Sequence, residues 1–213
     1  MSDKQQDPQA VLFDLARRYG TATVYEALKL DCMVDPAIHT IWRGAKIVAP
    51  AYPVQCSPGD NLAIHVAIER APRGSVLVVE CSGFIAGYWG EVLTVAAEAA
   101  GIVGLVIDGG VRDTEAIVAH QFPTFARGIS IRGTVKASMP GAGKPIRFGG
   151  VPVAAGDIVV ADDDGVIVVP ASRFEEAIQK SAVRVDKETE MMKKIREGVS
   201  TLEQMKLTHW RDK

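Results

Sequence analysis

The chain has 213 residues, of which 47% are hydrophobic and 23% are charged, and its formal net charge at pH 7 is −2. Such a chain can bury most of its apolar surface, which is typical of a globular protein with one large or two small domains. The weak net charge and the lack of a basic run with interleaved aromatic residues give no reason to expect a nucleic-acid partner.

The first ten residues are polar, and no apolar stretch is long and charge-free enough to span a bilayer. We therefore expect neither a signal peptide nor a membrane partner. Cysteine occurs at three positions, Cys32, Cys56 and Cys81, without CxxC spacing. This odd number argues against a disulfide framework or a zinc cluster and favours a reducing, cytoplasmic location.

The first half of the chain predicts helices followed by a buried strand. Apolar residues recur at helical spacing over residues 10–30, with Gly20 as the expected break between two helices. Residues 45–52 predict a strand and residues 61–70 a further helix. Residues 76–79 are continuously apolar, which indicates a strand covered on both faces.

Residues 75–107 have the pattern of strand, glycine-containing loop, alanine-rich helix and strand. This is a βαβ unit, which we expect to be right-handed. Its second strand is followed by the segment Asp108-Gly109-Gly110-Val111-Arg112-Asp113, in which Asp108 is interpreted as ending the strand. Open α/β sheets usually bind their ligands at such strand ends.

The remaining elements predict a mixed α/β protein. Residues 114–120 predict a short helix, and residues 127–150 predict an antiparallel section. The turn at Asp163-Asp164-Gly165 is expected to join two strands, and residues 171–198 predict one long amphipathic helix or two. We expect a single domain over residues 1–213, with a helical arm at the N-terminus and a helix at the C-terminus.

Arg112 and Asp113 are the first candidate site. An arginine binds carboxylates through two parallel hydrogen bonds, and a neighbouring carboxylate can bind a hard cation through oxygen. Together they indicate a site for an anionic substrate and a divalent metal. The same two residues also fit an aspartate that caps the following helix beside a surface ion pair, and their spacing leaves both interpretations open.

The loop Gly87-Tyr88-Trp89-Gly90, followed by a helix from Glu91, is the second candidate. The first turn of a helix has N–H groups without intrahelical partners, and these groups bind anions. The loop is neither GxGxxG nor a Walker motif, so a nucleotide site is poorly supported. The loop is therefore interpreted either as a binding site for a small carboxylate or as a simple turn between strand and helix.

Two further patterns are interpreted as structural. The acidic run Asp162-Asp163-Asp164-Gly165 lacks the spacing and terminal glutamate of a calcium loop and predicts a solvated turn. The four histidines have neither ligand spacing nor a nucleophile–base pattern, and each is interpreted as structural or exposed: His39, His65, His120 and His209.

Three segments are similar to the RraA-like family. They are GYWGEVLTVAAEAAGIVGLVIDGGVRDTEAI, FPTFARG and GDIVVADDDGVIVVP. The similarity extends from about Thr21 to Gly198, and its most specific part is Gly-Gly-Val-Arg-Asp after an apolar strand. The family includes 4-hydroxy-4-methyl-2-oxoglutarate/4-carboxy-4-hydroxy-2-oxoadipate aldolases and the regulator of ribonuclease E activity A.

The resemblance implies a ββα swivelling-domain-like fold, with a mixed sheet flanked by helices, assembled as a homotrimer or homohexamer. It implies a class II aldolase, a carbon–carbon lyase that depends on Mg²⁺ or Mn²⁺. Such an enzyme cleaves 4-hydroxy-2-oxo acids to pyruvate and also decarboxylates oxaloacetate. The alternative that the resemblance offers is a non-catalytic protein that binds and regulates ribonuclease E. The presence of both Arg112 and the neighbouring Asp113 in this chain favours the enzyme.

The resemblance also assigns roles to particular residues. Arg112 would contact the substrate, and Asp113 would hold the metal, partly through water. The pyruvate carboxylate would bind the backbone N–H groups of a loop that matches Gly90, Glu91, Val92 and Leu93. A glutamate from the C-terminal region of a neighbouring subunit would complete the surroundings of the metal, with Glu188 or Glu190 as candidates.

This chemistry agrees with the residues of the candidate site. Cleavage releases a pyruvate enolate, which a divalent metal stabilises as a Lewis acid and which Arg112 stabilises by its charge. The lack of a lysine in the motif disfavours a Schiff-base mechanism. Since no histidine is suitably placed in sequence, a metal-bound or carboxylate-held water is the expected base.

Overall fold

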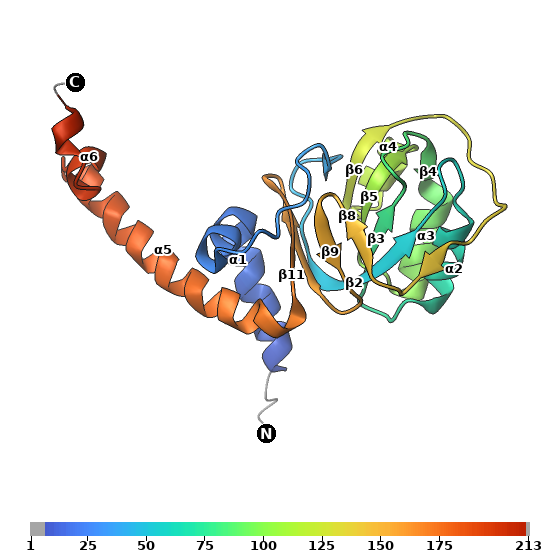
Figure 1. Cartoon of the computed structure of the whole chain (residues 1–213), viewed down its shortest axis with the longest axis horizontal. Coiled ribbons are helices and arrows are strands. Elements are labelled where there is room, and N and C mark those ends of the chain that lie inside the picture. Colours follow the sequence, from blue (N-terminus) through green and yellow to red (C-terminus); the bar gives the residue numbers. More distant parts are fainter. Residues whose placement is uncertain (1–6, 212–213) are drawn as a thin grey trace.

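The computed structural model describes residues 7–211 and is built around one mixed sheet (Figure 1). Along the main path of the sheet the strand order is β1-β6-β5-β3-β2-β10-β11; β4 pairs with β5, and β7 pairs with β2. These strands are β1 (His39–Thr40), β2 (Ile47–Gln55), β3 (Val76–Glu80), β4 (Gly87–Trp89), β5 (Gly104–Val111), β6 (Thr124–Ile129), β7 (Gly141–Ala142), β10 (Ile158–Asp162) and β11 (Gly165–Val169).

Parallel strands form the centre of the sheet. β3 pairs in parallel with β2 on one side and with β5 on the other, with Leu77 opposite Leu105. Residues 76–79 are all buried, as expected for a strand covered on both faces. The predicted βαβ unit is therefore confirmed, with α3 (Glu91–Ala100) between the parallel strands β3 and β5.

Three apolar clusters fill the molecule. The first joins the central strands to the side chains of α2 (Leu62–Arg70), α3 and α4 (Thr114–Ala119). The second lies on the opposite side of the same strands, where the hairpin of β8 (Ile146–Phe148) and β9 (Val151–Val153) contributes Phe148. In the third, β10 and β11 are covered by α1 (Pro8–Leu28) and by the start of α5 (Phe174–Arg196).

The sheet nearly closes on itself. The segment before β1 forms hydrogen bonds with β11 at the other end of the sheet, from Val34 N to Val166 O (3.0 Å) and from Val168 N to Cys32 O (3.0 Å). This arrangement covers the edge of β11 and brings β1 into contact with β11. The mixed α/β fold with helices around the sheet was predicted and is confirmed; the extent of the single domain, over residues 1–213, stays a prediction.

The first helix is broken where the sequence predicts. Gly20 has φ 79° and ψ 166°, which interrupts α1. Just after this break, the carboxylate of Asp162 accepts hydrogen bonds from Thr21 N (2.9 Å) and from the Thr21 hydroxyl. The acidic run does form a hairpin turn, but it is not merely solvated, because Asp163 also accepts a hydrogen bond from Gly44 N (2.9 Å).

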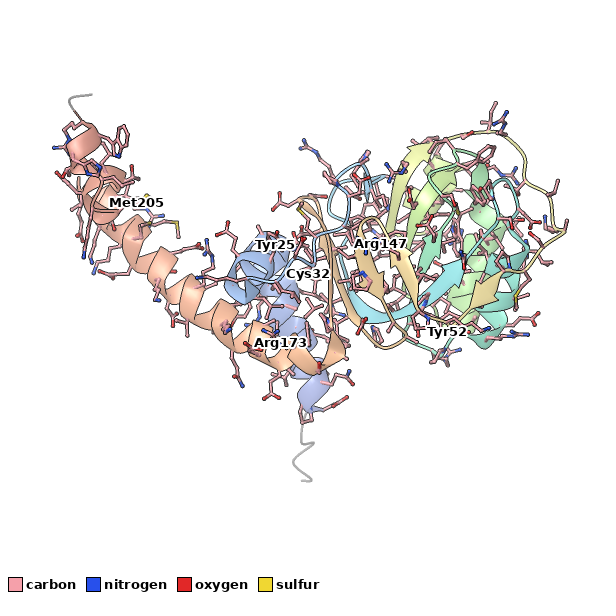
Figure 2. The ribbon with its side chains drawn as sticks, in the orientation of Figure 1. Tyr25, Cys32, Tyr52, Arg147, Arg173 and Met205 are labelled. Carbon is pink, nitrogen blue, oxygen red and sulfur yellow. The ribbon has the colours of Figure 1, made fainter. Side chains whose placement is uncertain are left out.

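The C-terminal helix begins on the body of the protein and then leaves it. The buried residues of α5 all lie in its first part: Phe174, Ala177, Ile178 and Ser181. The rest of α5, together with α6 (Thr201–Gln204), projects away from the sheet (Figure 1), and Figure 2 shows its side chains pointing outward as far as Met205. Across residues 7–211, no helix has the length and apolar character needed to cross a membrane.

Candidate functional site

A cavity of about 350 Å³ lies beside the ends of β4 and β5. This volume is at the lower end of the range of small-molecule sites. The lining residues come from the start of α2, the glycine loop, the first turn of α3, the end of β5 and the segment after β6. They are Asn61, His65, Gly87, Tyr88, Gly90, Val92, Leu93, Arg112, Asp113, Gly133, Thr134 and Lys136. The cavity therefore brings together the two candidate sites from the sequence.

Asp113 is placed to act in the cavity, although it occupies the N-cap position of α4. Its backbone is left-handed (φ 54°, ψ 40°), and its side chain forms no capping hydrogen bond with α4. Instead, the Oδ2 atom accepts a hydrogen bond from Glu91 N (3.2 Å) and lies 3.7 Å from Arg112 Nε. The carboxylate is thus directed toward the first turn of α3, which favours the binding interpretation over the helix cap.

The glycine loop is held directly against Arg112. Arg112 N donates a hydrogen bond to Trp89 O (2.8 Å), and the buried Trp89 donates from Nε1 to the hydroxyl of Thr94 (2.8 Å). Among residues 7–211, no acceptor contacts the N–H groups of Val92 and Leu93, which both line the cavity. Of the four predicted backbone donors, the Glu91 N–H already bonds Asp113, whereas the N–H groups of Gly90, Val92 and Leu93 have no acceptor among residues 7–211 and are available to an anion.

The other wall of the cavity was not predicted from the sequence. His65 was interpreted as structural or exposed, yet it lines the cavity together with Asn61, four residues earlier and on the same side of α2. The spacing of Asn61 and His65 is a signal that could have indicated a shared helix face. Thr134 and Lys136 had no such signal, because they lie in a segment without helix or strand.

The titratable groups of the cavity leave it with a positive character at neutral pH. Burial, and then the charge of Lys136, lower the pKa of His65, so its imidazole is neutral. Burial raises the pKa of Tyr88 to about 12, and its hydroxyl accepts a hydrogen bond from Gly59 N (2.6 Å). The charges that remain are those of Arg112 and Lys136 against that of Asp113, which suits an anionic ligand.

Glu188 and Glu190 do not reach this cavity in their own chain. Both lie in the projecting part of α5, where Glu188 pairs with Arg184 (2.7 Å) and Glu190 with Lys194 (3.7 Å). Within residues 7–211, no group of three or more histidine, cysteine, aspartate or glutamate side chains could hold a metal ion. The role of these glutamates in a neighbouring subunit's site stays a prediction.

Asp108 has a different role from the one predicted. β5 continues past it to Val111, so Asp108 does not end the strand. Its carboxylate forms an ion pair with Arg127 Nε, while Arg127 Nη2 bonds Asp35 Oδ2 at 2.8 Å. Asp108 is buried. The hydrogen bonds that Arg127 donates, first to Asp108 and then to Asp35, raise the pKa of Arg127. The cluster joins β5, β6 and the segment before β1.

Replacing Arg127 with methionine should destabilise the protein by about 2–3 kcal/mol, because it leaves the Asp108 carboxylate buried without its partner. The measurement is urea unfolding followed by circular dichroism. The double variant Arg127→Met/Asp108→Asn, which removes the unpaired charge, should recover about half of this loss. Equal destabilisation in the single and double variants would show that the cost comes from packing rather than from the ion pair.

The fold and the cavity together define a mixed α/β protein with a polar cavity at the ends of its central strands, lined by Arg112, Lys136 and Asp113. The family model that matches residues 21–168 is RraA-like, described as Aldolase/RraA. This match covers more than half of the chain, and the chain belongs to the RraA-like family. The family includes proteins named as aldolases.

Relatives and solved structures agree with this assignment. A protein of Halalkalibacterium halodurans named "Putative 4-hydroxy-4-methyl-2-oxoglutarate aldolase" is 36% identical over 169 residues, which cover 78% of this chain and 79% of that protein. An uncharacterized protein from Pseudomonas syringae pv. tomato is 29% identical with a TM-score of 0.83, covering 98% of each chain. Streptomyces coelicolor RraAS2, described as an unusual member of the RNase ES inhibitor RraA family, is 26% identical with a TM-score of 0.75, covering 89% of this chain and 100% of that one.

Proposed function

We propose that this protein is a divalent-metal-dependent aldolase that cleaves 4-hydroxy-2-oxo acids of the 4-hydroxy-4-methyl-2-oxoglutarate type to pyruvate. The observation that carries the proposal is the position of Asp113: its carboxylate turns away from the helix that it precedes and lies beside Arg112 and the first turn of α3. A carboxylate, a guanidinium and free backbone N–H groups around one cavity suit a small oxo acid.

The first turn of α3 would bind the carboxylate of the oxo acid. The N–H groups of Val92 and Leu93 have no acceptor among the described residues, and both residues line the cavity. The positive end of the α3 dipole adds to the attraction of an anion at this point. The substrate is thereby oriented with its 2-oxo group toward Arg112.

Arg112 would stabilise the charge that develops during cleavage. When the bond between C3 and C4 breaks, the electron pair moves into the 2-oxo group and an enolate oxygen forms. The guanidinium, half-exposed at the mouth of the cavity, would donate hydrogen bonds to that oxygen. A donor of this kind contributes roughly 10²–10³-fold to the rate in other enzymes.

The chain's donor set fits Mg²⁺ or Mn²⁺. Mg²⁺ is usually held by one or two carboxylates, with water and substrate oxygens as its other ligands. Asp113 provides such a carboxylate at the cavity, and Glu91 starts the adjacent helix. When bound, the cation would act as a Lewis acid on the 2-oxo group and lower the energy of the enolate. The Asp113 carboxylate would also hold the water that accepts the proton of the 4-hydroxyl group.

A second copy of the chain would complete the site. Asp113 alone provides few protein ligands, while α5 carries Glu188 and Glu190 beyond its last buried residue, Ser181, and away from the body of the protein. We therefore propose a homotrimer or homohexamer in which one of these glutamates approaches the neighbouring cavity. The same enolate chemistry extends to the decarboxylation of oxaloacetate, in which loss of CO₂ also leaves a pyruvate enolate.

The purified protein should release pyruvate from 4-hydroxy-4-methyl-2-oxoglutarate with Mg²⁺ or Mn²⁺ and should lose this activity in EDTA. Pyruvate is measured by coupling to NADH oxidation by lactate dehydrogenase. Restoring an excess of Mg²⁺ after EDTA treatment is the control for irreversible damage. Absence of pyruvate from both 4-hydroxy-4-methyl-2-oxoglutarate and oxaloacetate, with metal present, would overturn the proposal.

The alternative function is that of an RraA-type regulator that binds ribonuclease E without catalysis. The similarity to Streptomyces coelicolor RraAS2, from a family of RNase ES inhibitors, favours this alternative. Such a protein would need its outer surface but not the polar lining of the cavity. Inhibition of ribonuclease E by a variant that lacks the Asp113 carboxylate, with no pyruvate release by the wild type, would support the regulator.

A further inference from the structure

One wall of the cavity is formed by residues 130–140, which we call the strap. The strap contains neither helix nor regular strand, yet it is fixed to the start of α2. Val135 N donates a hydrogen bond to Gly59 O (2.9 Å), and Asn61 N donates to Val135 O (3.1 Å). These bonds hold Lys136 of the strap at the cavity, on the wall that also contains His65.

Asp60 is the residue that secures the strap. It is buried (3% exposed), and its Oδ2 atom accepts hydrogen bonds from Ala137 N (2.8 Å), Ser138 N (2.7 Å) and the Ser138 hydroxyl (3.0 Å). Its Oδ1 atom accepts a hydrogen bond from Leu62 N (2.9 Å) at the first turn of α2. One buried carboxylate therefore fixes both the helix and the strap, with Lys136 directly before the two bonded N–H groups.

The wall made by the strap and α2 has polar groups that lack partners. Among residues 7–211, no carboxylate pairs with Lys136. Asn61 is buried (5% exposed), and within the described part of the chain neither its Oδ1 nor the buried Nε2 atom of His65 has a hydrogen-bond partner. Leaving such groups unsatisfied is costly, and their position beside Lys136 gives this wall of the cavity a polar character.

We infer that Lys136 is a specificity-determining residue that binds the second carboxylate of a dicarboxylic oxo acid, and that Asp60 is a positioning residue that holds Lys136 in place. The inference rests on the proposed function, which places the 2-oxo acid end of the substrate at Arg112 and the first turn of α3. Lys136 lies on the same cavity and is its second cation. The other end of the substrate therefore lies near a positive charge, which favours a carboxylate at that end.

Replacing Lys136 with methionine should reduce kcat/KM for 4-hydroxy-4-methyl-2-oxoglutarate by about 10–100-fold, mainly through KM, since a charge-assisted hydrogen bond is lost. With 4-hydroxy-2-oxopentanoate, which lacks the second carboxylate, kcat/KM should stay within about threefold of the wild type. Lys144→Met is the matched control, because Lys144 is an exposed lysine outside the cavity. An equal loss with both substrates would overturn the inference.

Asp60→Asn tests the positioning role, because an amide nitrogen in place of one oxygen cannot accept the bonds that hold the strap. It should raise KM for the dicarboxylic substrate while leaving kcat with 4-hydroxy-2-oxopentanoate within about threefold. Thermal unfolding shows whether the variant is folded. A folded Asp60→Asn variant with unchanged preference for the dicarboxylic substrate would contradict the role of Asp60.

A binding measurement separates this inference from the proposed function. Calorimetric titration in Mg²⁺ compares 2-oxoglutarate with 2-oxopentanoate, which have the same number of carbon atoms and differ in the second carboxylate. The wild type should prefer 2-oxoglutarate by about 10-fold or more, and Lys136→Met should remove this preference. If the wild type releases no pyruvate from any substrate, the proposed reaction is wrong, whereas an equal affinity for the two acids would contradict the role of Lys136.

Discussion

Asp113→Asn should lower metal-dependent pyruvate release by about 10³-fold, which corresponds to about 4 kcal/mol of transition-state stabilisation. Asparagine has nearly the same shape and tolerates the left-handed backbone at this position (φ 54°), so the turn before α4 should form normally. What is lost is the negative charge that the proposed cation requires. Initial rates over a Mg²⁺ titration measure the effect, and the variant should need more Mg²⁺ for any remaining activity.

Glu115→Gln is the matched control for this prediction. Glu115 is an exposed carboxylate two residues further along the chain; it lies outside the 350 Å³ cavity, although it lines a more open surface hollow next to Arg112 and Asp113. Its replacement removes the same charge from the same end of α4 and should change the rate by less than about threefold. Full activity in Asp113→Asn would refute the assignment of Asp113 as the metal-binding residue, provided that thermal unfolding shows both variants to be folded.

Gly90→Ala should reduce kcat/KM by about 100-fold while leaving the fold intact. Gly90 is in an extended conformation (φ −162°), so alanine fits the backbone without strain. A Cβ atom at this position would clash with the Oδ2 atom of Asp113 and lie 3.1 Å from Arg112 Cγ. Both are atoms of side chains that can move, so the substitution displaces the two proposed functional groups, and shifts of about 1 Å can cost roughly 10²-fold in rate.

Gly133→Ala provides the comparison within the same cavity. Gly133 also lines it, but a Cβ atom there would have no neighbour within 4 Å. Pyruvate release by this variant should stay within about threefold of the wild type. If Gly90→Ala and Gly133→Ala have equal activity, then the close contact between Gly90 and Asp113 has no part in the reaction.

The central strands and helices could be predicted because each depends on a local pattern. The continuous apolar run before Glu80 indicates a strand covered on both faces, and Gly20 breaks the first helix as expected. The position of Asp108 could not be predicted from the same reasoning. A charged residue after an apolar run is typical of a strand end, but Arg127 from the neighbouring strand pairs with Asp108 and allows β5 to continue.

Only the side of the candidate site that is formed by β5 and α3 was predicted from the sequence. Arg112, Asp113 and the loop at Gly90 lie in one stretch of sequence around a βαβ unit, so their proximity follows from the topology. Lys136 and His65 are brought to the cavity by hydrogen bonds between the strap and the start of α2, which join segments more than 70 residues apart. No periodic pattern in the strap predicts these contacts, because most of the hydrogen bonds use backbone atoms of the strap, which every residue type provides.

The uneven packing of α5 has a consequence for the local stability of the protein. Amide hydrogens exchange with solvent in proportion to how easily their hydrogen bonds open, and opening costs least where little apolar surface is buried. In an isolated chain, the part of α5 after Ser181 should therefore exchange its amide hydrogens far faster than the part that packs against α1. Slow exchange along the whole helix at high protein concentration, and its acceleration on dilution, would identify this arm as the segment whose order depends on contact with another copy.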